Sequence, residues 1–166
     1  MMFRPMHPAV LFAFCVFASG AAHADEAAQC HAGGGTYLTG RIASGPTFRH
    51  GHSRHGVELS HTHLTLLSDR DGQTFDVAID NVFAAGYDSA GENVPAPLAQ
   101  LHAGIRLELC GKPYTNSAVP GIDWVHTDCG AAPTSYRPDG WLKILAANGT
   151  PGPNLESSRE YCGLWP

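Results

Sequence analysis

The residues of this chain that could do chemistry gather between positions 121 and 142. This stretch contains two tryptophans, one histidine, three aspartates and one cysteine, namely Trp124, Trp141, His126, Asp123, Asp128, Asp139 and Cys129. Side chains two residues apart share a face of a β-strand, so a strand over 122–127 would align Trp124 and His126, with Asp128 next in the row. Such a row suits a pocket wall. The alternative is that both tryptophans plug the end of a small barrel and His126 is a hydrogen-bonded core residue.

A group of histidines precedes this stretch and could bind a metal. Its members are His50, His52, His55, His61 and His63. Neutral imidazole is a common transition-metal ligand, and His61 and His63 would share a strand face. Together with His126 and Asp128 they could form a four-ligand site for zinc or another divalent cation. No His-Glu-x-x-His motif is present. We therefore favour the plainer interpretation of solvated loop histidines followed by two hydrogen-bonded ones.

Acid–base catalysis is the second chemistry that these residues allow. A carboxylate such as Asp128 could orient His126 as a general base, with His61 as a further catalytic candidate. The chain has no Gly-x-Ser-x-Gly nucleophile motif. The only enzyme class left is a histidine-dependent hydrolase, with or without a metal, acting on a phosphodiester or a glycan. A buried polar network is the alternative, and it is the one we favour.

The third chemistry is ring stacking. Aromatic side chains exposed in a groove stack on sugars or bases, whereas buried ones only fill the core. The candidates are Trp124, Tyr136, Trp141, Tyr114 and Phe48. The predicted ligand-binding residues are Trp124, His126, Asn81 and Trp141, of which Asn81 is included because of the family resemblance described below.

The first residues have the pattern of an export signal. Arg4 precedes an apolar run over 9–18, and Ala22-His23-Ala24 predicts cleavage before Asp25. The run is too short to span a membrane. We therefore expect a signal peptide over 1–24, an N-terminal segment over 25–35, a barrel over 36–145 and a tail over 146–166, in a periplasmic or secreted protein.

Four cysteines remain after the predicted signal. An even number in an exported chain predicts two disulfides, and we expect Cys162 to tie the tail to the body. The pairing is otherwise open among Cys30, Cys110, Cys129 and Cys162.

The charge of the chain suggests which partners to expect. Ten basic residues stand against 15 acidic ones, giving a net charge of −5. This balance predicts that nucleic acid is a disfavoured partner, apart from a local basic patch at Arg49–His55. A small molecule, a glycan or a protein is the expected partner.

The strand pattern predicts an all-β fold. Strands are expected over 36–42, 57–67, 73–81, 105–111 and 122–127, with a sixth over 141–145, loops over 43–56 and 112–121, and a short helix over 98–103. Three strands, a short helix and two further strands is the order of an OB-like barrel. An open β-sandwich is the alternative.

Several motifs of the chain resemble a family of small exported bacterial domains of unknown function. They are Ser60-His61-Thr62-His63-Leu64, Asp71-Gly72-Gln73-Thr74, Asn81, Ile122-Asp123-Trp124-Val125-His126-Thr127-Asp128 and Asp139-Gly140-Trp141-Leu142. The resemblance covers about 40–145 and implies an OB-like barrel without supplying an activity. Asp80 and Asp123 stand where the family has histidines, which implies an altered site.

Two functional hypotheses follow. The first is a non-catalytic, exported module that binds a ligand or partner through a Trp/His/Asp cleft. The second is the histidine-dependent hydrolase described above. They differ in whether His61, His63, His126 and Asp128 converge on one cleft.

Overall fold

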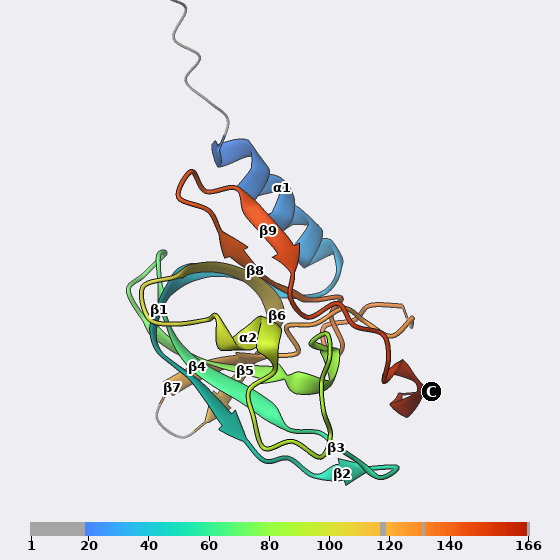
Figure 1. Cartoon of the computed structure of the whole chain (residues 1–166). Helices are drawn as coiled ribbons and strands as arrows, with labels where there is room; N and C mark the ends of the chain where they lie inside the picture. The colour runs from blue at the N-terminus through green and yellow to red at the C-terminus, as the bar shows by residue number, and fades with distance from the viewer. Residues whose placement is uncertain (1–18, 117–118, 131, 166) are drawn as a thin grey trace, which may run out of the picture.

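The computed structural model describes residues 19–116, 119–130 and 132–165, so most of the predicted signal peptide lies outside the described residues. Five strands form the body of the molecule (Figure 1). They are β1 (Thr36–Arg49), β4 (His61–Ser68), β5 (Thr74–Asp80), β6 (Arg106–Asn116) and β7 (Val119–Asp123).

These five strands close a barrel of the OB-fold type. Neighbouring strands pair in the order β1-β4-β5-β7-β6, and β6 returns to pair with β1. Within this ring only the β5–β7 pairing is parallel. Taking the five strands in chain order, the arrangement is 1-2-3-5-4-1, the Greek-key closure of an OB-fold. The prediction of an all-β, OB-like barrel is confirmed.

The remaining elements decorate this barrel. A hairpin of β2 (Ser53–Arg54) and β3 (Val57–Glu58) lies between β1 and β4. A second hairpin pairs β8 (Trp141–Leu145) with β6 and β9 (Pro151–Asn154) with β8. The helices are α1 (Ser19–Ala32), α2 (Ala96–Ala99) and the 3-10 turns η1 (Asn81–Phe83) and η2 (Cys162–Leu164). No helix in the described part of the chain is long and apolar enough to cross a membrane.

Strand alternation fills the barrel interior and determines which side chains face outward. On β4, Leu64 and Leu66 are buried in the core, whereas His61 and His63 point to the opposite face and stay partly exposed. Burying each leucine stabilises the fold by about 1.5–3 kcal/mol. The same pattern on β5 buries Ile79. The histidines are therefore placed on the outer face of the barrel by the period-2 geometry of β4.

Several strand boundaries differ from the sequence-based prediction, and the strand predicted over 57–67 is divided into β3 and β4, which belong to different sheets. The loop predicted over 43–56 was wrong because β1 continues to Arg49, and two register shifts near Ser44 break the alternation that would have revealed it. The loop predicted over 112–121 was wrong because β6 and β7 pair there. The strand predicted over 122–127 ends at Asp123, since Trp124 has a positive φ of 57° and leaves the extended region.

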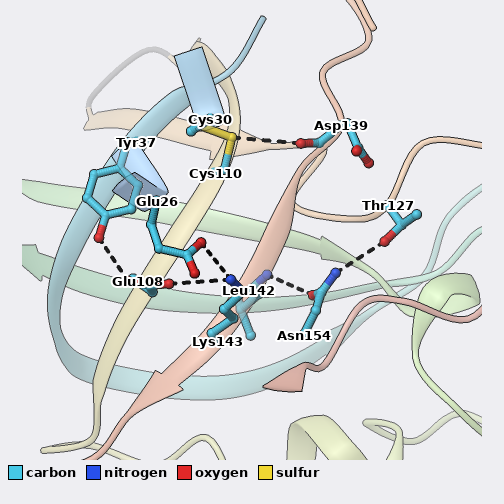
Figure 2. Close-up of polar contacts among 10 residues, drawn as sticks. All are labelled: Glu26, Cys30, Tyr37, Glu108, Cys110, Thr127, Asp139, Leu142, Lys143 and Asn154. Atoms are coloured by element: carbon cyan, nitrogen blue, oxygen red, sulfur yellow. Dashed lines mark hydrogen bonds and ion pairs between the residues drawn. A yellow bond between two sulfur atoms is a disulfide. The ribbon is translucent and has the colours of Figure 1, made fainter. Parts of the chain in front are cut away.

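Helix α1 is fixed to the barrel by a covalent bond and an ion pair. The Cys30–Cys110 disulfide joins α1 to β6, and Lys143 on β8 places Nζ 2.7 Å from Oε2 of Glu26 (Figure 2). Trp141 lies beside this disulfide and is only 6% exposed. The helix runs through the cleavage point predicted before Asp25, and both attachments lie on its C-terminal side.

The second disulfide holds the C-terminal tail. It joins Cys129, which follows β7, to Cys162 at the start of η2. The predictions of two disulfides and of a tail tied back through Cys162 are thus both confirmed.

Candidate functional site

A cavity of about 340 Å³ opens where the chain leaves β7 and meets η1 and the C-terminal tail. We call it the aromatic pocket. It is lined by Phe83, Trp124, His126, Asp128, Cys129, Gly130, Arg137 and Trp165. Three aromatic rings and one imidazole thus surround a space of the size that small-ligand sites have in proteins.

The rings of this pocket are held by stacking. His126 lies parallel to Phe83, with ring centroids 3.6 Å apart and planes at 5°. Trp165 packs 5.2 Å from Phe83, and the Cys129–Cys162 disulfide brings the tail that carries Trp165 to this position. Trp124 lies 5.0 Å from the His126 ring. The wall of the pocket is therefore largely fixed before any ligand arrives.

A tight backbone approach positions the segment that carries Trp124 and His126. Gly140 donates its backbone N–H to the His126 carbonyl at 2.9 Å. A side chain at Gly140 would lie 2.4 Å from the Trp124 carbonyl oxygen, so only glycine fits there. Trp124 itself has a left-handed backbone, and for a bulky residue such strain is concentrated at functional sites.

Asp80, at the end of β5, lies between two of the predicted site histidines. Its Oδ1 is 2.9 Å from His61 Nε2, and its Oδ2 is 3.4 Å from His126 Nε2. His126 Nδ1 donates to the Thr127 carbonyl at 2.9 Å. The hydrogen bond with Asp80 raises the pKa of His61, whereas burial lowers the pKa of His126 despite the same carboxylate. Burial thus favours the uncharged form of His126.

Two further cavities continue across the outer face of the barrel. The first, of about 360 Å³, is lined by His61, His63, Ala78, Asp80, Tyr114, Asp123 and Trp124. The second, of about 460 Å³, is lined by Ser44, Gly45, Thr47, Arg49, His63, Leu64, Thr65 and Asp76. We call them the polar cavity and the Arg49 cavity. The polar cavity is lined by residues of β4, β5, β6 and β7 and by Trp124, and the Arg49 cavity by residues of β1, β4 and β5.

Several buried polar atoms around these cavities have no hydrogen-bond partner within the described residues. They are Asp123 Oδ1, Trp124 Nε1 and Asp128 Oδ2. Burial raises the pKa of Asp123. Because nearly all buried polar groups in proteins are hydrogen-bonded, unpartnered ones beside a cavity mark positions where a ligand or water would bind.

Two predicted ligand-binding residues have structural surroundings instead. Asn81 is fully buried; its Oδ1 accepts from Thr62 Oγ1 at 2.6 Å and its Nδ2 donates to Ser60 Oγ at 3.0 Å. Trp141 packs beside the Cys30–Cys110 disulfide and lines none of the three cavities. Only Trp124 and His126 of the predicted ligand-binding set lie on the aromatic pocket.

The residues proposed for a metal site or for catalysis are divided among different partners. His61 and His126 meet at Asp80, whereas His63 Nδ1 lies 3.0 Å from Asp76 Oδ1. Asp128 donates its backbone N–H to Asp139 Oδ1 at 2.9 Å. In the described ranges, no group of three or more His, Cys, Asp or Glu side chains is arranged to hold a metal ion.

Sequence reasoning missed three residues of the aromatic pocket and the role of Asp80. Phe83 belongs to a segment that looked irregular, Arg137 to a loop, and Trp165 to the extreme tail. The available signal for Trp165 was its position three residues after Cys162. Once Cys162 is paired with Cys129, Trp165 must lie near the end of β7.

Comparisons with known proteins give structural likenesses but no family. No protein-family model and no curated protein matches the chain, so the family suggested by the motifs is not confirmed. A structure of the Plasmodium falciparum SSB in complex with ssDNA matches with a TM-score of 0.36 and 15% identity, over 68% of this chain and 94% of that one.

This match corrects one prediction. Nucleic acid was expected to be a disfavoured partner, yet the similar barrel was solved bound to ssDNA. The error lies in using net charge, which averages over the whole surface, to judge one face of it. We withdraw the exclusion. The assignment of the OB-like barrel depends on the strand pairing described above, and the ligand of the Plasmodium protein is not transferred to this chain.

Proposed function

We propose that this protein is a non-catalytic binding module that receives a ring of its ligand in the aromatic pocket. The observation that carries this proposal is the stacked wall of His126 on Phe83, flanked by Trp124 and Trp165 around a cavity of about 340 Å³. Stacking of a ring on an aromatic side chain contributes about 1–3 kcal/mol. A planar base, an aromatic group or the apolar face of a sugar would gain this energy.

The polar groups of the pocket support binding with a defined orientation. Arg137 is exposed and lines the pocket, as does the carboxylate of Asp128. Trp124 Nε1 and Asp128 Oδ2 both lack a partner. A few fixed polar groups around an apolar surface are typical of small-molecule sites, in which they orient the ligand.

Binding is better supported than hydrolysis. A general base must reach the proton that it removes. The Nδ1 atom of His126 is already engaged by the Thr127 carbonyl, its Nε2 faces Asp80, and its ring is 3% exposed. We infer that His126 supports the wall of the pocket by packing between Phe83 and Trp124, and does not act as a base.

We further propose that the protein is exported. Two disulfides fit an oxidising compartment, where such bonds persist. This proposal also accommodates the predicted signal peptide over 1–24, and it makes the periplasm or the exterior the place to look for the ligand.

Intrinsic fluorescence provides the test, because the chain has three tryptophans and two of them line the pocket. We would titrate the protein with nucleosides, monosaccharides and aromatic amino acids. A binding ligand should change the emission, and Trp124→Phe and Trp165→Phe should each remove part of the change. Trp141→Phe, the matched control, should retain all of it. A response equal in all variants, or none from any probe, would argue against the proposal.

A further inference from the structure

The aromatic pocket has neighbouring cavities, one of which shares Asp128 and Gly130 with it, and we call the aromatic pocket, the polar cavity and the Arg49 cavity together the groove. The aromatic pocket and the polar cavity share Trp124 as a lining residue, and the polar cavity and the Arg49 cavity share His63. The three cavities therefore form a series from the end of β7 across β5 and β4 to β1. The outer face of the second and third barrel strands, here β4 and β5, is also where OB-folds hold oligomeric ligands.

We propose that the groove binds a linear, uncharged oligosaccharide, with one sugar ring in the aromatic pocket and further units along the polar and Arg49 cavities. This proposal rests on the proposed binding function and extends it to a class of ligand. Each of the three cavities has a volume of at least about 340 Å³. A single ring fills only one of them, so a chain of linked rings is needed to occupy the series.

The charges along the groove favour a ligand without charge. Exposed Arg137 lies at one end and exposed Arg49 at the other. The carboxylates of Asp76, Asp80 and Asp123 lie between them. A polyanion would meet three carboxylates at the centre, and a polycation would meet an arginine at each end. A neutral chain is repelled at neither position.

The hydrogen-bonding groups of the groove suit hydroxyls. Asp123 Oδ1 is an acceptor without a partner, and Trp124 Nε1 is a donor without one. Between the polar and Arg49 cavities, Asp76 is hydrogen-bonded to both His63 and Tyr114. A sugar hydroxyl both donates and accepts, so one ligand can satisfy both Asp123 Oδ1 and Trp124 Nε1.

Two competing occupants are a single strand of nucleic acid and a basic peptide. Nucleic acid would bind through its phosphates, so its affinity would fall steeply with salt. A basic peptide would bind the central carboxylates but would meet Arg137 or Arg49 as it extended. Both are included as probes, because each makes a prediction that differs from that of a neutral glycan.

The test measures affinity against ligand length by calorimetry. The probes are monosaccharides and soluble chitin- and glucan-derived oligosaccharides of increasing length, an oligo-dT strand and an oligolysine peptide. At least one neutral series should bind about tenfold more tightly as the chain grows from one ring to several. The binding should change little with salt, since no net charge is neutralised.

Variants locate the bound chain. His63→Ala should lower the affinity for the long oligosaccharide by about tenfold and leave the affinity for the monosaccharide unchanged. Trp124→Ala should weaken both. His102→Ala, an exposed histidine outside the three cavities, is the matched control for His63→Ala and should alter neither.

The outcomes separate this proposal from the one on which it rests. Monosaccharide binding in the aromatic pocket without any gain from length would overturn the groove and leave the binding module intact. The protein could instead bind oligo-dT in a salt-dependent manner, or bind oligolysine, and show no response to any saccharide. That result would overturn the glycan proposal and identify the other ligand class as the occupant of the groove. Failure of every probe, together with no tryptophan response, would overturn both proposals.

Discussion

Two faces of the barrel use polar residues in opposite ways. On the α1 face, which we define by Glu26, Tyr37, Glu108 and Lys143, the polar groups bond to one another. Lys143 Nζ lies 2.7 Å from Glu26 and 3.7 Å from buried Glu108, and Tyr37 donates to Glu108 at 2.8 Å (Figure 2). On the groove face, three residues in the described part of the chain, Asp123, Trp124 and Asp128, each keep a buried polar atom without a hydrogen-bond partner, whereas beside the ion pairs of the α1 face the indole Nε1 of Trp141 is also without one.

This difference leads to a prediction about how the two faces respond to mutation. A polar group that finds its partner within the chain costs little to bury and helps to fix the fold. A polar group that lacks one is costly unless something else binds it. Mutations on the α1 face are therefore expected to lower the stability of the protein, and mutations on the groove face are expected to weaken ligand binding. The predictions below test this division.

The largest expected effect concerns the two disulfides. The Cys30–Cys110 bond has a sequence separation of 80 and the Cys129–Cys162 bond one of 33. The loop-entropy relation gives about 4.5 kcal/mol for the longer loop and about 3.7 kcal/mol for the shorter. Replacing both cysteines of each pair by serine should lower the free energy of unfolding in this order, as measured by denaturant titration.

The same two variants should differ in binding. Loss of Cys129–Cys162 frees the tail that carries Trp165, so ligand affinity should fall even under conditions in which the protein remains folded. Loss of Cys30–Cys110 should leave affinity unchanged in the folded fraction. If both variants bound equally well, the tail would not be part of the pocket.

Two tryptophans provide the next comparison. Trp141 is 6% exposed beside a disulfide on the α1 face, so Trp141→Ala should cost about 3–5 kcal/mol. Trp124 is partly exposed and has φ of 57°. Because glycine tolerates this backbone, relief of strain worth about 1–3 kcal/mol should largely offset the lost contacts in Trp124→Gly. Thermal unfolding measures both changes. Equal losses of stability would contradict the division of the two faces.

These two residues also show how far the sequence could lead. Strand patterns were sufficient to predict the barrel, because burial alternates along most of β4 and the apolar residues Phe75, Val77 and Ile79 alternate in the sequence of β5. It failed at Trp124, where a positive φ ends the strand and removes the expected row of Trp124, His126 and Asp128. That conformation depends on the close approach of Gly140, which is distant in sequence.

The pocket was less predictable than the barrel for a related reason. Asp80 became central only because the parallel β5–β7 pairing brings its strand beside the segment that carries His126. Phe83 and Trp165 reach the pocket through a 3-10 turn and a disulfide. Such contacts are set by tertiary packing, and local residue patterns contain little information about them.

A buried carboxyl between β9 and η2 gives a pH-dependent prediction. Glu156 is fully buried, neither of its carboxylate oxygens has a partner, and burial raises its pKa well above 4.5, with a further contribution from the charge of Asp80. The folded state therefore holds this proton more tightly than the unfolded state does. Stability should be highest below about pH 4.5 for this group, and should be lost as the pH rises from there towards the folded-state pKa.

Glu156→Gln tests this by removing the titrating group while keeping its shape. The variant should gain stability over the wild type at pH 8, by about 1.4 kcal/mol for each unit by which the folded-state pKa exceeds its unfolded value, up to that pH. At pH 4 the two should be similar. Glu160→Gln, at an exposed position nearby, is the control and should show no such gain. A variant less stable than the wild type at pH 8 would mean that the carboxylate is charged and bound.

The smallest effect concerns the carboxylate that two histidines share. Asp80 is hydrogen-bonded to His61 and raises its pKa, and it also acts against the burial that lowers the pKa of His126. Asp80→Asn should therefore lower the pKa of both histidines, which NMR of the imidazole protons would follow against pH. Asp76→Asn removes the partner of His63 and should leave the pKa values of His61 and His126 unchanged, which makes it the matched control.

The same two histidines affect stability. The raised pKa of His61 makes a stabilising contribution that is present below pH 6.5 and is lost as the pH rises through the folded-state pKa. The lowered pKa of His126 acts in the opposite sense, since protonation below pH 6.5 favours the unfolded state. If Asp80→Asn changed the pKa of neither histidine, Asp80 would not link His61 and His126 electrostatically. The polar cavity and the aromatic pocket would then be separate cavities with no shared charge.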